Sequence, residues 1–153
     1  MNCDARPPVT GAARPRAPHL RPSLIALVAL GGALGTAARV GVTLVVPSWG
    51  AFDTAIFAIN VVGAFVLGVL LERLLRSGPD EGGRRRLRLL VGTGVLGGFT
   101  TYSSLATETA ALAGAGGGDL AVAALYGLLS LVLGVLAAAA GIRVGARLAG
   151  RAS

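Results

Sequence analysis

The residues best suited to chemistry lie in one apolar stretch, 92–108, with the sequence GTGVLGGFTTYSSLATE. Its glycines weaken a helix, because Gly in a helix interior costs about 1 kcal/mol relative to Ala. Hydroxyl side chains follow and end at an acid, Glu108. In lipid, non-helical backbone is tolerated only where protein buries it or where it lines a cavity. The stretch therefore predicts a broken helix whose freed carbonyl, N–H and hydroxyl groups can replace the water shell of an ion.

The same stretch has a second interpretation. Gly, Ser and Thr are also the residues that let two membrane helices approach closely. The residue types alone leave ion binding and close packing both open.

The whole chain has the composition of an integral membrane protein. Its 153 residues are 54% hydrophobic and 14% charged, and the mean hydropathy is +0.73, which excludes an ordinary soluble domain. The formal charge is +7, and all fourteen basic residues are Arg. They flank apolar segments, which indicates membrane orientation and contact with anionic lipid, not nucleic acid. The single cysteine, Cys3, excludes a disulfide framework and a cysteine-based metal site.

Four apolar segments organise the chain, and each is long enough to cross a hydrocarbon core of about 30 Å. Residues 1–23 are rich in Pro and Arg and are expected to form a disordered cytoplasmic tail. The predicted fold is all-α: an integral membrane four-helix subunit whose third helix is broken. The membrane domain is predicted at 24–148, with spans at about 24–46, 54–75, 87–112 and 120–142, followed by a basic tail at 149–153.

Few polar residues lie at membrane depth outside the third span. Arg39 either anchors the first span by reaching the interface or lines a vestibule. Asn60 is costly in lipid unless its amide is satisfied, so it must face another helix or a polar pore. Tyr126 and Ser130 lie four residues apart on one face of the fourth span. They form either a polar track or a hydrogen bond between helices.

Glycine spacing predicts two close-packing faces. Gly31 and Gly35 form a small-xxx-small pair in the first span. In the fourth span Gly127, Gly134 and Gly141 recur every seven residues, which places them in one stripe.

The residues also limit the function classes. The spans contain no histidine, no paired carboxylates and no nucleophile beside a base, and the 92–101 stretch lacks the lysine of a phosphate loop, so an enzyme is not expected. Four spans are too few to enclose a wide pore, so function requires a dimer or a larger assembly. A small four-helix drug or cation exporter is one alternative, although such exporters resemble one another in carrying a Glu in the first span, where this chain has none. A non-transporting membrane assembly subunit is another.

Three motifs, in order along the chain, carry a resemblance to a known family. They are Gly32-Ala33-Leu34-Gly35 followed by Arg39, Asn60-Val61-Val62-Gly63-Ala64-Phe65 with Gly68, and Gly94-Val95-Leu96-Gly97-Gly98-Phe99-Thr100-Thr101-Tyr102-Ser103-Ser104 with Glu108. With these motifs the chain resembles the fluoride channel family (CrcB/Fluc) from about Gly31 to Ser130.

The resemblance implies a passive, fluoride-selective channel in the cell membrane that limits fluoride toxicity by letting the ion leave the cytoplasm. It implies four-helix subunits paired as an antiparallel dimer, two narrow fluoride pores and a structural sodium ion at the third-helix break. Carried onto this sequence, it assigns the sodium-binding carbonyls to Gly97 and Thr100, the pore amide to Asn60, the aromatic gate to Tyr102, hydroxyl and polar track positions to Ser103, Ser104, Glu108, Tyr126 and Ser130, and a vestibule position to Arg39.

The chain departs from the family pattern at two places. Where the family usually has two Phe, this chain has Tyr102 and Leu105, and a leucine offers no ring edge to an anion. Ala55-Ile56 replaces the usual Gly-Thr before the pore Asn. The arginines also lie almost entirely on one side, which predicts that both termini are cytoplasmic. We therefore expect an antiparallel dimer whose partner is a related, oppositely oriented subunit, with a homodimer as the alternative.

Overall fold

The computed structural model describes residues 21–47, 54–114 and 119–150, and every regular element in these ranges is helical. The elements are α1 (Pro22–Val45), α2 (Thr54–Arg76), α3 (Gly82–Leu87), the π-helical segment η2 (Arg88–Val95), α4 (Leu96–Phe99), α5 (Tyr102–Gly114) and α6 (Asp119–Ala149). Most of the predicted N-terminal tail and the last three residues lie outside the described ranges.

Four of these helical stretches are long and apolar enough to cross a membrane. They correspond to the four predicted spans, and the third consists of α3, η2, α4 and α5 in succession. The fourth runs past residue 142 to Ala149, and at 1.5 Å per residue the 31 residues of α6 extend about 46 Å. This length exceeds a hydrocarbon core of about 30 Å, and Arg143 and Arg147 lie in the C-terminal part of the helix.

Local sequence explains both ends of α1 and the end of α2. Pro22 starts α1, since its fixed φ and missing N–H suit the first helical turn. Val46 is extended because it precedes Pro47, and α1 stops there. Arg73 and Arg76 lie in the last turn of α2, where cations stabilise the helix dipole. Gly78, with a φ of +122°, then makes the turn toward α3.

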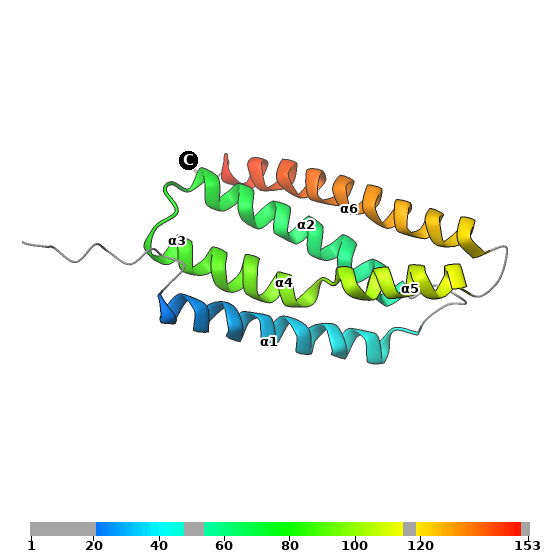
Figure 1. The fold of residues 1–153 in the computed structure, drawn as a ribbon. Helices are drawn as coiled ribbons and strands as arrows, with labels where there is room; N and C mark the ends of the chain where they lie inside the picture. Colours follow the sequence, from blue (N-terminus) through cyan, green and yellow to red (C-terminus); the bar gives the residue numbers. More distant parts are fainter. Residues whose placement is uncertain (1–20, 48–53, 115–118, 151–153) are drawn as a thin grey trace, which may run out of the picture.

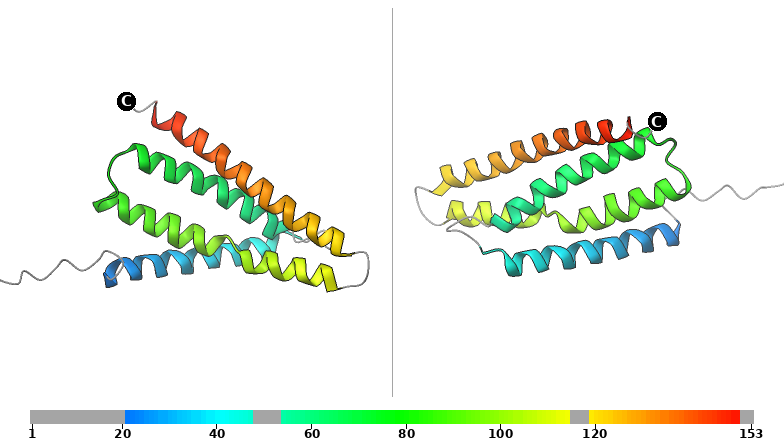
Figure 2. Two further views of the ribbon diagram at one scale, coloured as in Figure 1. Left: turned by 45° about the horizontal axis from the view of Figure 1, so that its top comes forward. Right: turned by 180° about the vertical axis from the view of Figure 1, so that it is seen from behind.

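The helices pack as two pairs. Helix α6 runs along α2, whereas α1 lies along η2 and α4 on the other side of the molecule (Figures 1 and 2). Helix α5 leaves α1 and packs against α6 instead. The break in the third span thus lets one span contact both pairs.

Glycines set the closest helix contacts, and they confirm the predicted face on α1. A Cβ at Gly31 would meet the carbonyl oxygen of Leu90, and one at Gly35 would meet that of Val95. Gly94 and Gly98 of the third span reciprocate, with a Cβ at Gly94 only 2.9 Å from the Cα of Gly31.

The predicted glycine stripe on α6 is only partly correct. Gly141 packs against the backbone of Phe65 in α2, but Gly134 has no atom within 4 Å of its would-be Cβ among the described residues. A Cβ at Gly127 would meet only the side chain of Thr109, at 3.8 Å. The stripe fails because α6 diverges from α2 toward the N-terminal end of α6 (Figure 1), so one face cannot touch the same neighbour at every seventh residue.

Most of the apolar surface is not buried within the chain. The buried hydrophobic core of the described residues comprises Ala55, Ile56, Ile59, Leu96, Ala123 and Tyr126. Large side chains such as Leu44, Leu131 and Val135 are at least 60% exposed. In water such exposure would be strongly unfavourable, so the surface fits lipid and partner helices.

Candidate ion path

The third span loses its helical geometry at Thr100 and Thr101, between α4 and α5. Thr100 is extended, with φ of −78° and ψ of 154°, although its N–H still donates to the Leu96 carbonyl at 3.0 Å. The Thr101 N–H donates to Asn60 Oδ1 at 2.9 Å, and Asn60 Nδ2 donates to the Thr101 carbonyl at 3.0 Å. One amide from α2 therefore satisfies both backbone polar groups of Thr101, as a helix break in lipid requires.

Two carbonyl groups at the break lose the N–H that an unbroken helix would give them. The N–H four residues after Gly97 belongs to Thr101 and donates to Asn60. The N–H four residues after Thr100 belongs to Ser104 and donates to the Thr101 hydroxyl at 3.2 Å. The carbonyl oxygens of Gly97 and Thr100 thus lack their helical donors, and uncharged oxygens of this kind suit a hard cation.

The Thr101 hydroxyl organises the first turn of α5, a role that the sequence analysis did not assign. It accepts the Ser104 N–H as an N-cap does, and its Oγ1 lies 3.1 Å from Ser103 Oγ and 3.2 Å from Ser104 Oγ. The sequence contains a signal for this cap: Thr101 follows the last glycines of the stretch and lies three residues before Ser104. A group of three hydroxyls therefore begins at the break, and its Thr101 member is buried.

A second residue missed from sequence, Thr36, connects α1 to the break. Its hydroxyl donates to the Gly98 carbonyl at 3.4 Å. This bond is long, so it adds little to the packing of Gly98 against Gly32.

A groove of about 950 Å³ runs beside the break and is walled by α2, α4, α5 and α6. Half of the residues that line it are Gly or Ala, among them Gly63, Ala64 and Ala123. The predicted site residues that the groove brings together are Asn60, Gly97, Thr100, Tyr102 and Ser130. Tyr102 is 82% exposed and, with Leu105, forms part of the wall.

The structure places the remaining predicted residues at different positions. Tyr126 is 6% exposed and Ser130 is 8% exposed, so both lie on the buried face of α6. Ser130 Oγ is buried and has no hydrogen-bond partner among the described residues. The hydroxyls of Ser103 and Ser104 contact that of Thr101 at the break, and these two residues do not line the groove.

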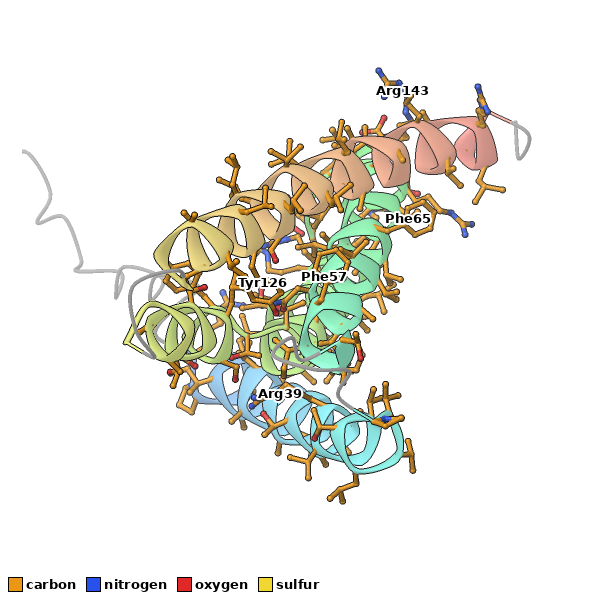
Figure 3. The ribbon with its side chains drawn as sticks, turned by 90° about the vertical axis from the view of Figure 1, so that its right-hand side faces the viewer. Arg39, Phe57, Phe65, Tyr126 and Arg143 are labelled. Carbon is orange, nitrogen blue, oxygen red and sulfur yellow. The ribbon has the colours of Figure 1, made fainter. Side chains whose placement is uncertain are left out.

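Arg39 lies apart from the groove. It belongs to α1, whereas Tyr126 belongs to α6 on the far side of the third span (Figure 3). Its Nε is buried and has no hydrogen-bond partner within the described part of the chain. The side chain of Glu108 lies outside the described residues, although its backbone belongs to α5.

Comparisons with known proteins place this geometry in context. Residues 26–142 match the family model described as "CrcB-like protein, Camphor Resistance (CrcB)". The chain is 49% identical over 131 residues to the fluoride-specific ion channel FluC 2 of Leifsonia xyli, covering 84% of this chain and 87% of the relative. It is 46% identical over 126 residues to a fluoride-specific ion channel FluC of Thermus thermophilus, covering 81% and 96%. It is 43% identical over 124 residues to that of Deinococcus radiodurans, covering 79% and 94%.

Proposed function

The chain belongs to the CrcB family, and on this premise we propose that it is a subunit of a fluoride-selective channel that lets fluoride leave the cytoplasm passively. It is a multi-pass membrane protein of a transport family, not an enzyme. The observation that carries the proposal is the break at Thr101, which Asn60 holds open beside a groove at membrane depth.

The chemistry of fluoride fits the groups on this path. Fluoride is small and tightly hydrated, so a dry path must offer strong donors. Asn60 uses its oxygen and one N–H on Thr101, and a primary amide has a second N–H to give. The buried Ser130 hydroxyl has no partner among the described residues and can donate as well. The positive ring edge of Tyr102 supplies a third contact, and narrow spacing excludes larger halides.

The experiment that tests this function is fluoride efflux from liposomes containing the purified chain. Fluoride efflux that is much faster than chloride efflux supports a selective channel. A folded, correctly inserted chain that releases no fluoride, alone or with a related subunit, would exclude the channel and leave a non-transporting assembly subunit.

The proposed channel is an antiparallel dimer, because one subunit leaves the groove open on one side. Half of the residues that line the groove are Gly or Ala, and a Cβ at Gly127 or Gly134 on its α6 wall would meet no backbone atom of the described chain within 4 Å. Such surfaces admit a partner helix at close range. Two subunits then enclose narrow paths that one four-helix chain cannot form.

The proposed cofactor is a structural sodium ion at the break. The carbonyls of Gly97 and Thr100 fit this role, because their helical donors bond to Asn60 and Thr101 instead. When bound, sodium supplies a fixed positive charge near an anion path and joins the subunits. For sodium binding, the side chain at position 100 then matters less than the backbone conformation of Thr100, which positions the carbonyl.

We expect the protein to be more heat-stable in sodium than in a large organic cation such as N-methyl-D-glucamine. Any ligand that binds only the folded state raises the unfolding temperature by mass action. Thermal unfolding in the two salts at equal ionic strength measures the effect. The same temperature in both salts would contradict a bound sodium ion.

The best variant for this test is Gly97→Ala, which favours helix where the carbonyl must stay free. A Cβ at Gly97 has no atom within 4 Å among the described residues, so the substitution causes no steric clash there. Gly98→Ala is unsuitable, because its Cβ would meet the Gly32 carbonyl oxygen in α1. We expect Gly97→Ala to reduce the stabilisation by sodium while unfolding normally in the organic cation.

The proposed partner is a related subunit inserted in the opposite orientation. By sequence, thirteen of the fourteen arginines lie on the side of the two termini and the second loop: Arg6, Arg14, Arg16, Arg21, Arg73, Arg76, Arg84, Arg85, Arg86, Arg88, Arg143, Arg147 and Arg151. In the structure α1 begins, α2 ends and α6 ends at this same end of the molecule (Figure 1). Such asymmetry favours one orientation, with both termini cytoplasmic.

We therefore expect C-terminal reporter fusions to place almost all copies with a cytoplasmic C-terminus. An antiparallel homodimer requires both orientations, so a single orientation requires a different partner. That partner also supplies an aromatic side chain where this chain has Leu105. Comparable populations in both orientations, together with fluoride efflux from the chain alone, would establish the homodimer instead.

A further inference from the structure

A second cavity lies far from the break, at the end of the molecule where α1 begins. It has a volume of about 430 Å³ and lies between the start of α1 and α3. Its charged lining consists of Arg21, Arg85 and Arg86. Its apolar wall is formed by Leu24 and Leu27, which are three residues apart and so share one face of α1.

The positive charge of this cavity has little compensation. No acidic side chain lines it, and neither Arg21 nor Arg86 has an ion pair within the described ranges. Arg85 lies 3.6 Å from an Asp80 carboxylate oxygen. That carboxylate makes its shorter contact, 2.7 Å, with Arg88, which does not line the cavity.

The ionised carboxylate of Asp80 does not cancel the positive charge of the cavity. The hydrogen bond from Arg88 is the main cause that lowers the pKa of the Asp80 carboxyl below its ordinary value. Asp80 is therefore ionised at neutral pH, and its single charge is shared between Arg88 and Arg85. The three cavity arginines keep a net positive charge that a bound anion would neutralise.

We propose that this cavity binds the phosphate of an anionic phospholipid of the phosphatidylglycerol class, with an acyl chain along Leu24 and Leu27. Guanidinium groups match phosphate oxygens in a planar, bidentate geometry. At the α1 N-terminus Pro22 has no N–H and the Leu24 N–H donates to the Arg21 carbonyl at 3.0 Å, so the first turn adds the N–H of Ser23, which also lines the cavity.

The position of the cavity selects a lipid over free phosphate. Arg21 directly precedes the first residue of a membrane-spanning helix, and Arg85 and Arg86 lie in α3, at the start of the third span. The arginines therefore lie at the level of lipid headgroups. The leucine wall continues from them toward the hydrocarbon core, where free phosphate has nothing to contact but an acyl chain does.

The test uses the full-length chain, purified in a zwitterionic detergent. Phosphatidylglycerol and phosphatidylcholine with identical acyl chains are titrated separately. The unfolding temperature and the lipid retained per chain, measured by native mass spectrometry, report binding. We expect phosphatidylglycerol alone to raise the unfolding temperature saturably and to remain bound at about one molecule per chain.

Two charge-matched double variants show where the lipid binds. We expect Arg21→Gln with Arg86→Gln to weaken phosphatidylglycerol binding roughly 30-fold, which corresponds to about 1 kcal/mol per arginine near an anionic lipid. The control is Arg143→Gln with Arg147→Gln, which removes the same charge from the end of α6, at the same end of the molecule. Neither control arginine lines the cavity, so this control should change binding less than about twofold.

Several outcomes would overturn the proposal. Equal losses in the two double variants would indicate diffuse surface attraction, and equal binding of both lipids would exclude headgroup recognition. Inorganic phosphate that reproduces the full stabilisation at the same concentration would identify a free-anion site. If the double variant does not fold, Arg86→Gln alone serves, since Arg86 is exposed, and unchanged binding in it would contradict the site. None of these readouts depends on fluoride transport.

Discussion

Replacing Asn60 by leucine should lower fluoride efflux from liposomes by about one to two orders of magnitude. A hydrogen bond to a charged group contributes about 1.5–3 kcal/mol, and each 1.36 kcal/mol corresponds to tenfold in rate. Asn60 lines the groove beside the break, so leucine removes a donor from the proposed path. Efflux measured with a fluoride electrode, at matched protein incorporation, gives the result.

The structure adds an effect on stability. Leucine leaves the N–H and carbonyl of Thr101 without the Asn60 amide, and Thr101 is 9% exposed. An unsatisfied buried polar group costs about 1–3 kcal/mol, so the variant should also unfold more easily.

The matched control is Thr43→Leu, which places the same side chain in the spanning part of α1. Among the described residues the Thr43 hydroxyl bonds to the Val40 carbonyl of its own helix, at 2.9 Å, so this variant should transport normally. Stabilisation by sodium separates the two roles of Asn60: if it persists in Asn60→Leu while efflux is lost, the amide acts in the path. Wild-type efflux from folded Asn60→Leu would contradict the assignment.

Gly35→Ala should destabilise the folded protein by about 3 kcal/mol. Its Cβ would collide with the Val95 carbonyl oxygen and lie 2.9 Å from the Phe99 N atom. Both obstacles are backbone atoms of the third span, which cannot turn aside as a flexible side chain does. Overpacking of this kind typically costs about 1–3 kcal/mol, and α1 must shift to relieve it. Unfolding of the variant in detergent, followed by circular dichroism, measures the loss.

Gly41→Ala is the matched control on the same helix. No atom lies within 4 Å of its would-be Cβ among the described residues, so no clash follows there. Alanine also favours helix over glycine by up to about 1 kcal/mol, so this variant should be as stable as the parent or slightly more stable. Equal destabilisation by the two substitutions would contradict the close contact at Gly35.

The glycines of the third span show which of their roles could be predicted from the sequence. The Gly-rich stretch supported both a helix break and close packing, and the structure contains both at different residues. Gly94 and Gly98 pack against α1, Gly97 stays open, and the helix ends after Phe99. Gly145, which the sequence analysis did not single out, packs against Val69 of α2.

The sequence by itself determined the four membrane spans, the approximate position of the break and the close-packing face of Gly31 and Gly35. It could do so because span length, apolarity and helix weakening are local properties. Each of them is a property of one stretch of sequence and does not depend on which helices pack against that stretch.

Only the tertiary structure decided which groups meet at the break. Asn60 was recognised as needing a partner, but its partner, Thr101, lies 41 residues away, at the break between α4 and α5. The same packing determined that the Thr101 hydroxyl caps α5 and that Gly134 remains uncovered within the described chain. The relative register of two helices depends on all their contacts at once. A glycine or an amide in the sequence therefore shows that a close approach or a hydrogen bond is possible, but not with which residue.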